Sequence, residues 1–450
     1  MSKTKPSLPK GTRDFGPGVS AKRSYIIDKI KQNFIRYGFA QIETPSMENL
    51  SVLTGKYGDE GDQLLFKVLN SGDYLGKTTL DDYERGSRQL TTKISDKGLR
   101  YDLTVPFARF VVMNQNEITF PFKRFQIQPV WRADRPQKGR YREFYQCDAD
   151  IIGSKGLWSE TELTLLFRDV FDDLGLKDYI IKVNHREILF LLATYVGLQD
   201  QTISFCAELD KLDKIGTEKV RQNIEALGAD PDKLQETMDL LSITGREELM
   251  AKLKEIDGEN VGVFQLEAYF QSLQSIDPAI QVELDVSLAR GLSYYTGMIY
   301  EVKPTSVQMG SISGGGRYDN LTGVFGLNNV SGVGISFGLD RIYDVLEELQ
   351  LFPAEVLNSL DLLVVHFNEE NLVHGHEVVM KLRESGLKAD LYPENTKIRK
   401  QFDYADKIGA AYTLVIGDEE MESARYMLKD MQTGDQKPLP LDEIIRLIKG

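Results

Sequence analysis

Apolar and polar residues alternate in three short stretches of the chain, which is the pattern of a strand with one buried face. The stretches are residues 99–105 (LRYDLTV), 123–132 (KRFQIQPVWR) and 144–151 (FYQCDADI). The second and third flank a cationic loop, residues 133–142. We therefore expect these two to pair as an antiparallel hairpin.

The polar positions within each stretch share one face, and the three polar faces together carry both signs of charge. They hold Arg100, Asp102, Thr104, Arg124, Gln126, Gln128, Arg132, Gln146, Asp148 and Asp150. A solvated sheet face is the ordinary interpretation of any one such strand. Three faces of mixed sign beside a cationic loop favour a pocket, suited to a ligand that carries an amine and a phosphate.

Longer segments show helical spacing of apolar residues. Helices are predicted over residues 19–36, over 156–176 and through most of 186–276. Strand patterns return from Val282 to Val302 and in VSGVGISFG (330–338), which runs directly into another predicted helix. From about residue 358 short strands and helices alternate, which predicts a small α/β domain of about 90 residues.

Three segments carry weaker signals. Residues 70–95 are polar and rich in Gly and Asp, which suggests an excursion or a loop. SISGGGRYDNL (311–321) lacks the spacing of a phosphate loop or a dinucleotide fold, so a flexible turn is favoured. HGH (374–376) has no third ligand nearby, and a surface helix is therefore favoured over a metal site.

Composition places the chain among globular proteins. It has 450 residues, 41% hydrophobic and 27% charged, which favours two or three domains. The apolar run 188–198 is too short to span a bilayer, and the N-terminus shows no apolar signal region. Cys147 and Cys206 give neither a disulfide framework nor a Cys-x-x-Cys metal pair. A cytoplasmic protein without a membrane partner or a metal site of its own is expected.

Charge is distributed unevenly. The formal net charge is −14, yet residues 131–142 (WRADRPQKGRYR) hold five cations and one anion. An acidic balance opposes general affinity for nucleic acids, so contact with a polyanion must come from a local patch such as this one.

Taken together, these stretches resemble the histidyl-tRNA synthetases, a family of class II aminoacyl-tRNA synthetases. Residues 37–49 (YGFAQIETPSMEN), 125–150 and 332–342 (GVGISFGLDRI) are similar to motifs 1, 2 and 3 of that class. LARGLSYYTG (288–297) and SGGGRYDNL (313–321) resemble two stretches peculiar to the histidine family. The resemblance covers nearly the whole chain.

The resemblance implies an α/β fold with three parts. Residues 1–185 and 277–350 would form an α+β catalytic domain built on the antiparallel class II sheet. Residues 186–276 would be a helical insertion, and 358–450 a small α/β anticodon-binding domain. A homodimer with Pro45 at its interface is implied as well.

The implied activity has two steps. L-Histidine is activated with ATP to histidyl-adenylate and pyrophosphate, and histidine is then transferred to the 3′ end of its tRNA. ATP is a substrate, and Mg²⁺ would be bound mainly through it. Neither step needs a protein nucleophile, so positioning and electrostatics should supply the catalysis.

The resemblance also implies roles for individual residues. Arg132 and Arg290 would be catalytic at the α-phosphate, and with Arg341 they would bind ATP. Histidine binding is implied for Asp102, Leu103, Thr104, Arg132, Gln146, Asp150, Arg290, Tyr294 and Tyr295. An approach to the acceptor end of the tRNA is implied for Arg135, Lys138, Arg140 and Arg142.

Within this set, Asp102 and Thr104 would bind the α-amino group, and Asp150 with the two tyrosines would read the imidazole. Since a hydrogen-bonding pocket leaves buried groups unpaired when an apolar analogue enters, no editing domain is expected in 186–276.

Two positions do not follow the pattern simply. Alternation counted from Val282 places Arg290 on the apolar side, so a bulge or turn at Gly291 would have to re-aim it. Ser293 stands where many members of the family have aspartate, which affects the support of Arg290 and the tyrosines.

The main alternative is a non-catalytic synthetase-like regulatory subunit of ATP phosphoribosyltransferase. Such paralogues usually lack the C-terminal tail and lose catalytic residues, whereas this chain has the tail and all three arginines. A tRNA-sensing domain of a kinase and a synthetase for another amino acid are further alternatives. No kinase motif is present, and LARGLSYYTG argues against the latter.

Overall fold

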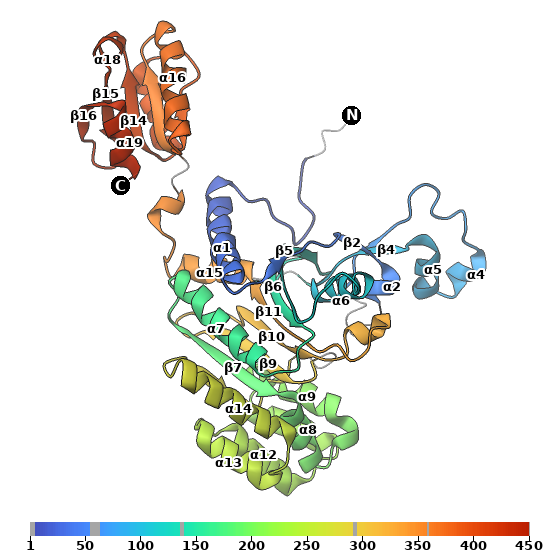
Figure 1. The fold of residues 1–450 in the computed structure, drawn as a ribbon. Helices are drawn as coiled ribbons and strands as arrows, with labels where there is room; N and C mark the ends of the chain where they lie inside the picture. The colour runs from blue at the N-terminus through green and yellow to red at the C-terminus, as the bar shows by residue number, and fades with distance from the viewer. Residues whose placement is uncertain (1–4, 55–63, 136–138, 291–294, 358–359, 450) are drawn as a thin grey trace. The chain divides into compact units, whose positions relative to one another are not determined.

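The structure, a computed structural model, describes residues 5–54, 64–135, 139–290, 295–357 and 360–449 (Figure 1). The chain forms two compact units. One comprises residues 1–14 and 26–351, and the other comprises residues 15–25 and 352–450. Helix α1 (Pro17–Arg36), which confirms the first predicted helix, contributes residues to both.

A large sheet forms the centre of the first unit, with strand order β1-β5-β6-β11-β10-β9-β7-β8. Its strands are β1 (Ala40–Gln41), β5 (Phe122–Trp131), β6 (Glu143–Ile152), β7 (Tyr179–His185), β8 (Val282–Leu284), β9 (Met298–Pro304), β10 (Ser313–Tyr318) and β11 (Gly332–Gly338). Pairing is antiparallel except between β1 and β5 and between β7 and β8. This confirms the predicted antiparallel sheet.

One face of this sheet is apolar and is covered by helices. Helices α7 (Trp158–Asp173) and α15 (Leu339–Glu348) lie against it, and Figure 1 shows them on the same side. Aromatic rings fill the space between: the centroid of Phe337 lies 5.4 Å from that of Phe167 and 5.6 Å from that of Phe171. Burial of these rings fixes which face is the core and leaves the other face available for polar side chains.

A smaller sheet of order β2-β4-β3 lies beside the large one. It contains β2 (Met47–Asn49), β3 (Lys67–Val68) and β4 (Lys97–Leu99), with helices α2 (Leu50–Leu53), α4 (Leu80–Glu84), α5 (Ser87–Ile94) and α6 (Thr104–Met113). Residues 70–95, predicted to be an excursion or a loop, thus contain two short helices. Thr79 starts the first of them with a capping box that includes Asp82.

The prediction of a strand over residues 99–105 was wrong. Strand β4 ends at Leu99 and helix α6 begins at Thr104. Asp102 accepts a hydrogen bond at 3.3 Å from the backbone N–H of Val105, and Pro106 stands in the first turn, where no donor is needed. These signals for the start of a helix outweigh an alternation of polar and apolar residues that is only a few residues long.

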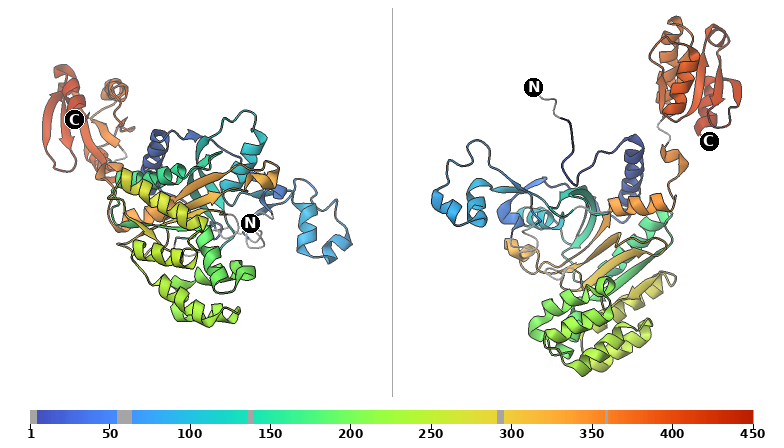
Figure 2. Two further views of the ribbon diagram at one scale, coloured as in Figure 1. Left: turned by 60° about the horizontal axis from the view of Figure 1, so that its bottom comes forward. Right: turned by 180° about the vertical axis from the view of Figure 1, so that it is seen from behind.

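Between β7 and β8 the chain is helical, as predicted for residues 186–276. The segment contains α8 (Arg186–Tyr195), η1 (Gln199–Gln201), α9 (Thr202–Leu209), α10 (Leu212–Ile215), α11 (Thr217–Ala226), α12 (Pro231–Leu241), α13 (Arg246–Ile256) and α14 (Val261–Ile276). Both views in Figure 2 show these helices gathered at the β7 edge of the sheet. They belong to the first compact unit, so the insertion boundaries stay a prediction.

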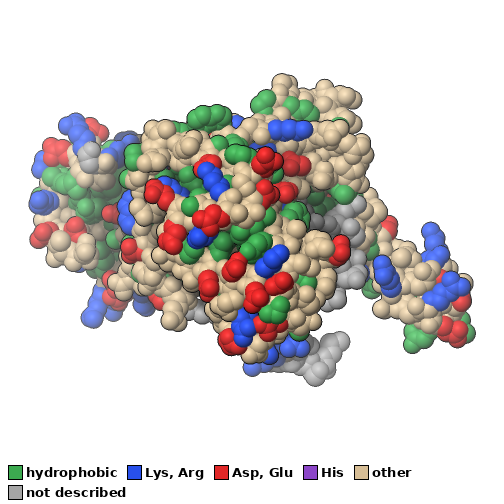
Figure 3. All heavy atoms as spheres, turned by 90° about the horizontal axis from the view of Figure 1, so that it is seen from below, with side chains coloured by type: hydrophobic (Ala, Val, Ile, Leu, Met, Phe, Trp, Pro, Cys, Tyr) green, Lys and Arg blue, Asp and Glu red, His purple; other side chains and the backbone are tan. Residues whose placement is uncertain are grey.

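The surface of this helical segment is mainly acidic. It contains 17 Asp and Glu residues and 9 Lys and Arg residues. Figure 3, which views this side of the molecule, shows red carboxylates and fewer blue cations around apolar patches. Such a surface does not attract a polyanion as a whole, so any contact with RNA here must be local.

The second unit contains a mixed sheet of order β13-β12-β14-β15-β16. Its elements are η3 (Ala354–Leu357), β12 (Leu360–His366), α16 (Glu370–Glu384), β13 (Ala389–Leu391), α17 (Ile398–Lys407), β14 (Ala410–Ile416), α18 (Asp418–Ser423), β15 (Arg425–Asp430), β16 (Gln436–Pro440) and α19 (Leu441–Lys449). The predicted alternation is confirmed, with α18 and β16 in addition. HGH lies on a helix as expected, where His374 Nε2 lies 2.8 Å from the Tyr426 hydroxyl.

The described residues contain neither a membrane-spanning helix nor a cluster of metal ligands. None of the helices there is both long and apolar enough to cross a membrane. No group of three or more His, Cys, Asp or Glu side chains in the same part of the chain is placed to hold a metal ion.

Candidate active site

The polar face of the large sheet is built by the predicted hairpin. Strands β5 and β6 pair antiparallel with Arg124 opposite Asp150, Gln126 opposite Asp148 and Gln128 opposite Gln146. Residues directly opposite in a sheet share a face. The alternation of polar residues in these two strands therefore predicted both the pairing and the face correctly.

The glycine-rich segment 311–321 continues this face and does not form the flexible turn that was predicted. Its residues Ser313–Tyr318 form β10, a central strand. A Cβ on Gly316 would lie 2.7 Å from the ring of Tyr295. On the next strand, a Cβ on Gly334 would lie 1.9 Å from a carboxylate oxygen of Asp150. Glycine stands at these positions because neighbouring side chains occupy the space.

A cavity of about 530 Å³ borders this face. Its lining comes from the β5–β6 loop, from strands β6, β9, β10 and β11, and from helix α15. Among the predicted site residues it brings together Arg132, Arg140, Gln146, Arg290, Tyr295 and Arg341. Residues that are more than 200 positions apart in the chain thus meet at a single cavity.

Four arginines line this cavity: Arg132, Arg140, Arg290 and Arg341. Arg132 donates from Nε to the backbone oxygen of Tyr101 at 2.9 Å. Arg341 donates to the backbone oxygens of Gly139 at 3.2 Å and Ser311 at 2.5 Å. Burial lowers the pKa of Arg341, and the nearby charges of Arg140, Arg290 and Arg132 lower it further. Such a cluster of guanidinium groups suits a polyphosphate ligand.

Arg290 lines the cavity, although the alternation had placed it on the apolar side. Strand β8 ends at Leu284, so alternation counted from Val282 does not extend to Arg290, and this step of the prediction was wrong. Its Nη1 lies 2.8 Å from Glu301, and its Nε lies 3.7 Å from Asp210. Gly291 and Ser293, whose roles were predicted, lie outside the described residues.

Some predicted residues do not line the cavity. Asp102, Leu103 and Thr104 are buried at the start of α6. Asp150 is buried on β6. The charge of Asp102 nevertheless acts on Asp148, the acidic neighbour of Asp150 on the same face. Asp102 therefore lies near enough to the polar face of the sheet for its charge to act there.

The predicted tRNA-binding residues have different surroundings. Arg135 and Arg140 are exposed on the β5–β6 loop. Arg142 is half-buried, and its Nε donates to the backbone oxygen of Asp134 at 3.2 Å. This hydrogen bond stabilises the base of the loop. Lys138, like Tyr294 of the predicted histidine site, lies outside the described residues.

Two residues that contact Asp150 were not predicted. The Tyr318 hydroxyl donates to Oδ1 of Asp150 at 2.6 Å, and Arg124 Nη2 lies 2.7 Å from Oδ2. Burial raises the pKa of Asp150, and the charge of Arg124 opposes that rise. Burial also raises the pKa of Asp148, to about 7. The alternation placed Arg124 on the polar face, but nothing in the sequence paired it with Asp150.

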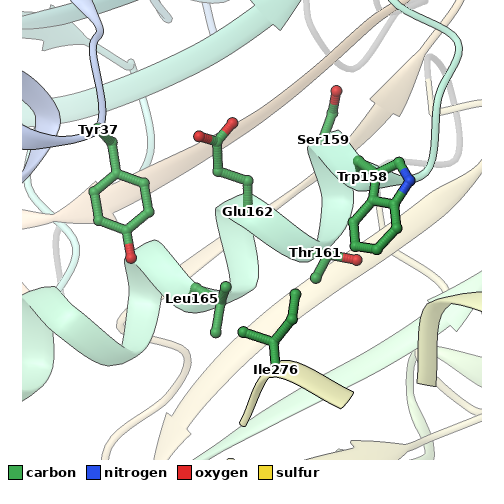
Figure 4. A pocket seen from close by; sticks show the side chains of 7 residues that line it. All are labelled: Tyr37, Trp158, Ser159, Thr161, Glu162, Leu165 and Ile276. Atoms are coloured by element: carbon green, nitrogen blue, oxygen red, sulfur yellow. The ribbon is translucent and has the colours of Figure 1, made fainter. Parts of the chain in front are cut away.

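A second cavity, of about 440 Å³, lies along α7 and contains none of the predicted site residues. Figure 4 shows its lining: Tyr37, Trp158, Ser159, Thr161, Glu162, Leu165 and Ile276. Its carboxylate, on Glu162, forms an ion pair with Lys123 at 2.6 Å. The lining offers no group of side chains for chemistry.

The fold and the first cavity define a class of enzyme. The sheet is antiparallel and has a polar face, its hairpin carries a cationic loop, and one of its strands leads into a helix whose arginine lines the cavity. Together these features form the catalytic domain of a class II aminoacyl-tRNA synthetase.

Comparison with known proteins identifies the family within this class. Residues 78–342 match the family profile described as histidyl-tRNA synthetase, and residues 361–450 match an anticodon binding domain. The chain is 51% identical to the histidine–tRNA ligase of Cytophaga hutchinsonii over 98% of this chain and 99% of that protein. It is 50% identical to that of Christiangramia forsetii over 99% of both chains.

A solved structure agrees with these relatives. The crystal structure of histidyl-tRNA synthetase from Nostoc sp. PCC 7120 superposes with a TM-score of 0.84, at 29% identity and 99% coverage of both chains. The chain belongs to the histidyl-tRNA synthetase family. The predicted family and fold class are thereby confirmed.

Proposed function

We propose that this chain is a histidine–tRNA ligase and that both steps of its reaction take place at the cavity lined by the four arginines. The observation that carries the proposal is the convergence of Arg132, Arg290 and Arg341 with Gln146 and Tyr295 on one cavity of a class II sheet. Sequence relatives at about half identity over their full length support the same activity.

In the first step a carboxylate oxygen of histidine attacks the α-phosphorus of ATP. The bond from that phosphorus to the bridging oxygen breaks, and pyrophosphate leaves. Arg132 and Arg290 stabilise the negative charge that develops on the phosphoryl oxygens. In the second step the terminal ribose hydroxyl of the tRNA attacks the histidyl carbonyl, and AMP leaves.

Histidine is held on the polar face of the sheet. Asp102 and Thr104 bind its α-amino group, and Gln146 helps to orient it. Asp150 accepts a hydrogen bond from the imidazole, with Tyr294 and Tyr295 beside it. An analogue without a ring N–H would leave Asp150 buried and short of a partner, which is the physical basis of selection.

ATP is held by the arginine cluster, with Arg341 stacked over the adenine. The carboxylates in the lining are Asp134, Glu301 and Asp340. Glu301 is shared with Arg290 and Lys303, and Asp340 is paired with Arg13. This set fits a Mg²⁺ ion held mainly by the phosphates of ATP, since Glu301 and Asp340 already pair with cations. When bound, such an ion would supply positive charge beside the phosphates of ATP.

The tRNA acceptor end is contacted by the β5–β6 loop through Arg135, Lys138, Arg140 and Arg142, and the anticodon by the second unit. Arg142 would contribute mainly by holding the loop in place. A homodimer and a cytoplasmic location complete the proposal, and both stay predictions.

The regulatory-subunit alternative is not favoured. A non-catalytic subunit needs no cluster of phosphate-binding arginines, yet this cavity has four of them. The relatives at about half identity are histidine–tRNA ligases over their full length.

Histidine-dependent exchange of pyrophosphate into ATP tests the proposal directly. Wild-type protein should support exchange with histidine and with no other amino acid. Arg290→Ala should lower the exchange rate by about a hundredfold or more, because it removes charge that faces the transition state. Arg221→Ala is the matched control and should not change it, because this half-buried arginine of α11 pairs with Glu218 and Glu225 and does not line the cavity. A folded wild-type protein that binds histidine but shows no exchange would favour the regulatory subunit.

A further inference from the structure

Arg124 is a charged residue that is completely buried on the polar face of the sheet. Its side chain has an exposed fraction of 0%. Its guanidinium carbon lies 4.0 Å from the centroid of the Phe107 ring, and its Nη2 lies 2.7 Å from Asp150. Among the described residues Asp150 is the ion-pair partner of this guanidinium, and none of its three nitrogens makes a well-aligned hydrogen bond there. A buried arginine stays charged, so its partner must supply the opposite charge.

Asp150 is buried, contacts Arg124 and Tyr318, and lies over a glycine of the neighbouring strand. Arg124 contacts Oδ2, and the Tyr318 hydroxyl donates to Oδ1. On the neighbouring strand the position opposite Asp150 is Gly334, which has no side chain to cover the carboxylate. An ionised carboxylate accepts about four hydrogen bonds, so two contacts leave capacity for a ligand.

Arg124 also supplies positive charge next to several buried carboxyl groups. Asp148 lies two residues from Asp150 on the same face, and its Oδ1 has no hydrogen-bond partner among the described residues. Burial raises the pKa of Asp148 to about 7; Arg124 lowers it, while Asp150 and Asp102 raise it. Neighbouring carboxylates in a low-dielectric site do not all ionise unless a cation compensates them.

We propose that Arg124 is a positioning residue for histidine recognition: with Tyr318 it fixes the carboxylate of Asp150 and keeps it an acceptor for the imidazole N–H. This rests on the proposed function, in which Asp150 reads the imidazole. Arg124 does not line the cavity, so it acts through Asp150 and not on the substrate itself.

Loss of the cation changes the acids in a defined direction. In Arg124→Met the buried carboxylates lose their compensating charge, so burial favours protonation near neutral pH. A protonated Asp150 becomes a donor, and its fixed orientation is lost. The groups that face this site are Arg124 on β5, Asp148 and Asp150 on β6, Tyr295 before β9, Tyr318 on β10, Ser336 on β11 and Asp102 before α6.

The test compares the KM for histidine with the KM for ATP in pyrophosphate exchange, for wild type, Arg124→Met and Arg124→Lys. Near pH 6.5 Arg124→Met should raise the KM for histidine by about a hundredfold, since it removes one partner of a buried ion pair. The KM for ATP should change by less than about threefold, because the arginines that bind ATP remain in place.

Two further readouts separate recognition from a structural role. In Arg124→Met the KM for histidine, divided by the wild-type value at the same pH, should become smaller as the pH rises, because the acids then ionise. Arg124→Lys should recover a large part of the loss, because it restores the charge without the planar fork. Arg109→Met is the matched control: it breaks the ion pair with Glu48 at 2.5 Å, outside the cavity, and should leave both KM values unchanged.

An unchanged KM for histidine in Arg124→Met overturns the inference, as does an equal rise in both KM values. If Arg124→Met does not fold, Arg124→Lys decides by the same comparison, and equal shifts in the two KM values overturn the inference. Absence of exchange in the wild type would instead contradict the proposed function.

Discussion

Single residues of this site are explained by the space and charge around them. Gly334 is required because the carboxylate of Asp150 fills the position where a Cβ would stand. Gly316 is required because the ring of Tyr295 does the same. Both glycines were visible in the sequence, but their purpose was not, since each depends on a side chain from another strand.

Gly334→Ala should weaken histidine binding more than ATP binding. Its Cβ would lie 1.9 Å from the Asp150 carboxylate, so that group must move. A displacement of about 1 Å at a reacting or recognition group costs about a hundredfold, and we expect an increase of about tenfold to a hundredfold in the KM for histidine. Pyrophosphate exchange with each substrate varied in turn measures both constants.

Gly16→Ala is the control for this substitution, since a Cβ there would meet no atom within 4 Å. Its constants should equal those of the wild type. A Gly334→Ala protein with a normal KM for histidine would show that Asp150 does not read the imidazole.

At the scale of elements, local signals at helix starts determined the structure in places where the alternation of polar and apolar residues gave a wrong prediction. Residues 99–105 alternate like a strand, but the Asp102 carboxylate accepts from the backbone N–H of Val105 and a helix begins at Thr104. Helix α8 begins in a comparable way at His185, whose Nδ1 accepts from the backbone N–H of Glu187 at 3.1 Å. Its Nε2 therefore carries the proton and donates to Oε1 of Gln265 at 2.8 Å.

His185 should make the stability of the protein fall in mild acid. Burial lowers its pKa from 6.5 to about 4. Between these values the unfolded chain binds a proton that the folded protein does not, so the free energy of unfolding decreases as the pH falls through this window. The full loss is about 3 kcal/mol near the lower end. Urea unfolding at a series of pH values measures it.

His185→Asn provides the comparison, because asparagine keeps a capping acceptor and does not titrate. The difference in unfolding free energy between wild type and His185→Asn should change by about 1–3 kcal/mol from neutral pH to about pH 5. A difference that stays constant with pH would contradict the assignment of a buried neutral His185.

At the scale of the whole molecule, two compact units divide the proposed work. The first holds the cavity for adenylate formation, and the second has the fold matched to an anticodon binding domain. In the second unit helix α17 carries four exposed cations at its start and end: Lys397, Arg399, Lys400 and Lys407. Lys400 lies 3.5 Å from Glu394, an exposed pair that contributes little to stability.

Arg399→Ala with Lys407→Ala should weaken tRNA binding and leave pyrophosphate exchange unchanged. Each cation that binds a phosphate contributes about one unit to the slope of the salt dependence, so the double variant should lower that slope by about two units. Charging at subsaturating tRNA, measured over a range of salt concentrations, tests this. Lys381→Ala, an exposed cation on α16, serves as control, and an unchanged slope in the double variant would indicate that α17 is only a solvated surface.

The sequence by itself determined whatever depends on local pattern or on recognisable motifs. Alternation in β5 and β6 predicted their pairing and polar face, because a strand has a period of two. Helical spacing predicted α7 and the helices between β7 and β8. The motifs indicated the family, since they record which residues the chemistry needs.

Only the tertiary structure decided what depends on residues distant in the chain. The ion pair of Arg124 with Asp150 joins two strands, and the hydroxyl of Tyr318 reaches the same carboxylate from 168 positions away. The cavity lining likewise combines Arg132 with Arg290 and Arg341. Burial and neighbouring charge set the pKa and orientation of each group, and neither quantity exists until the strands are packed together.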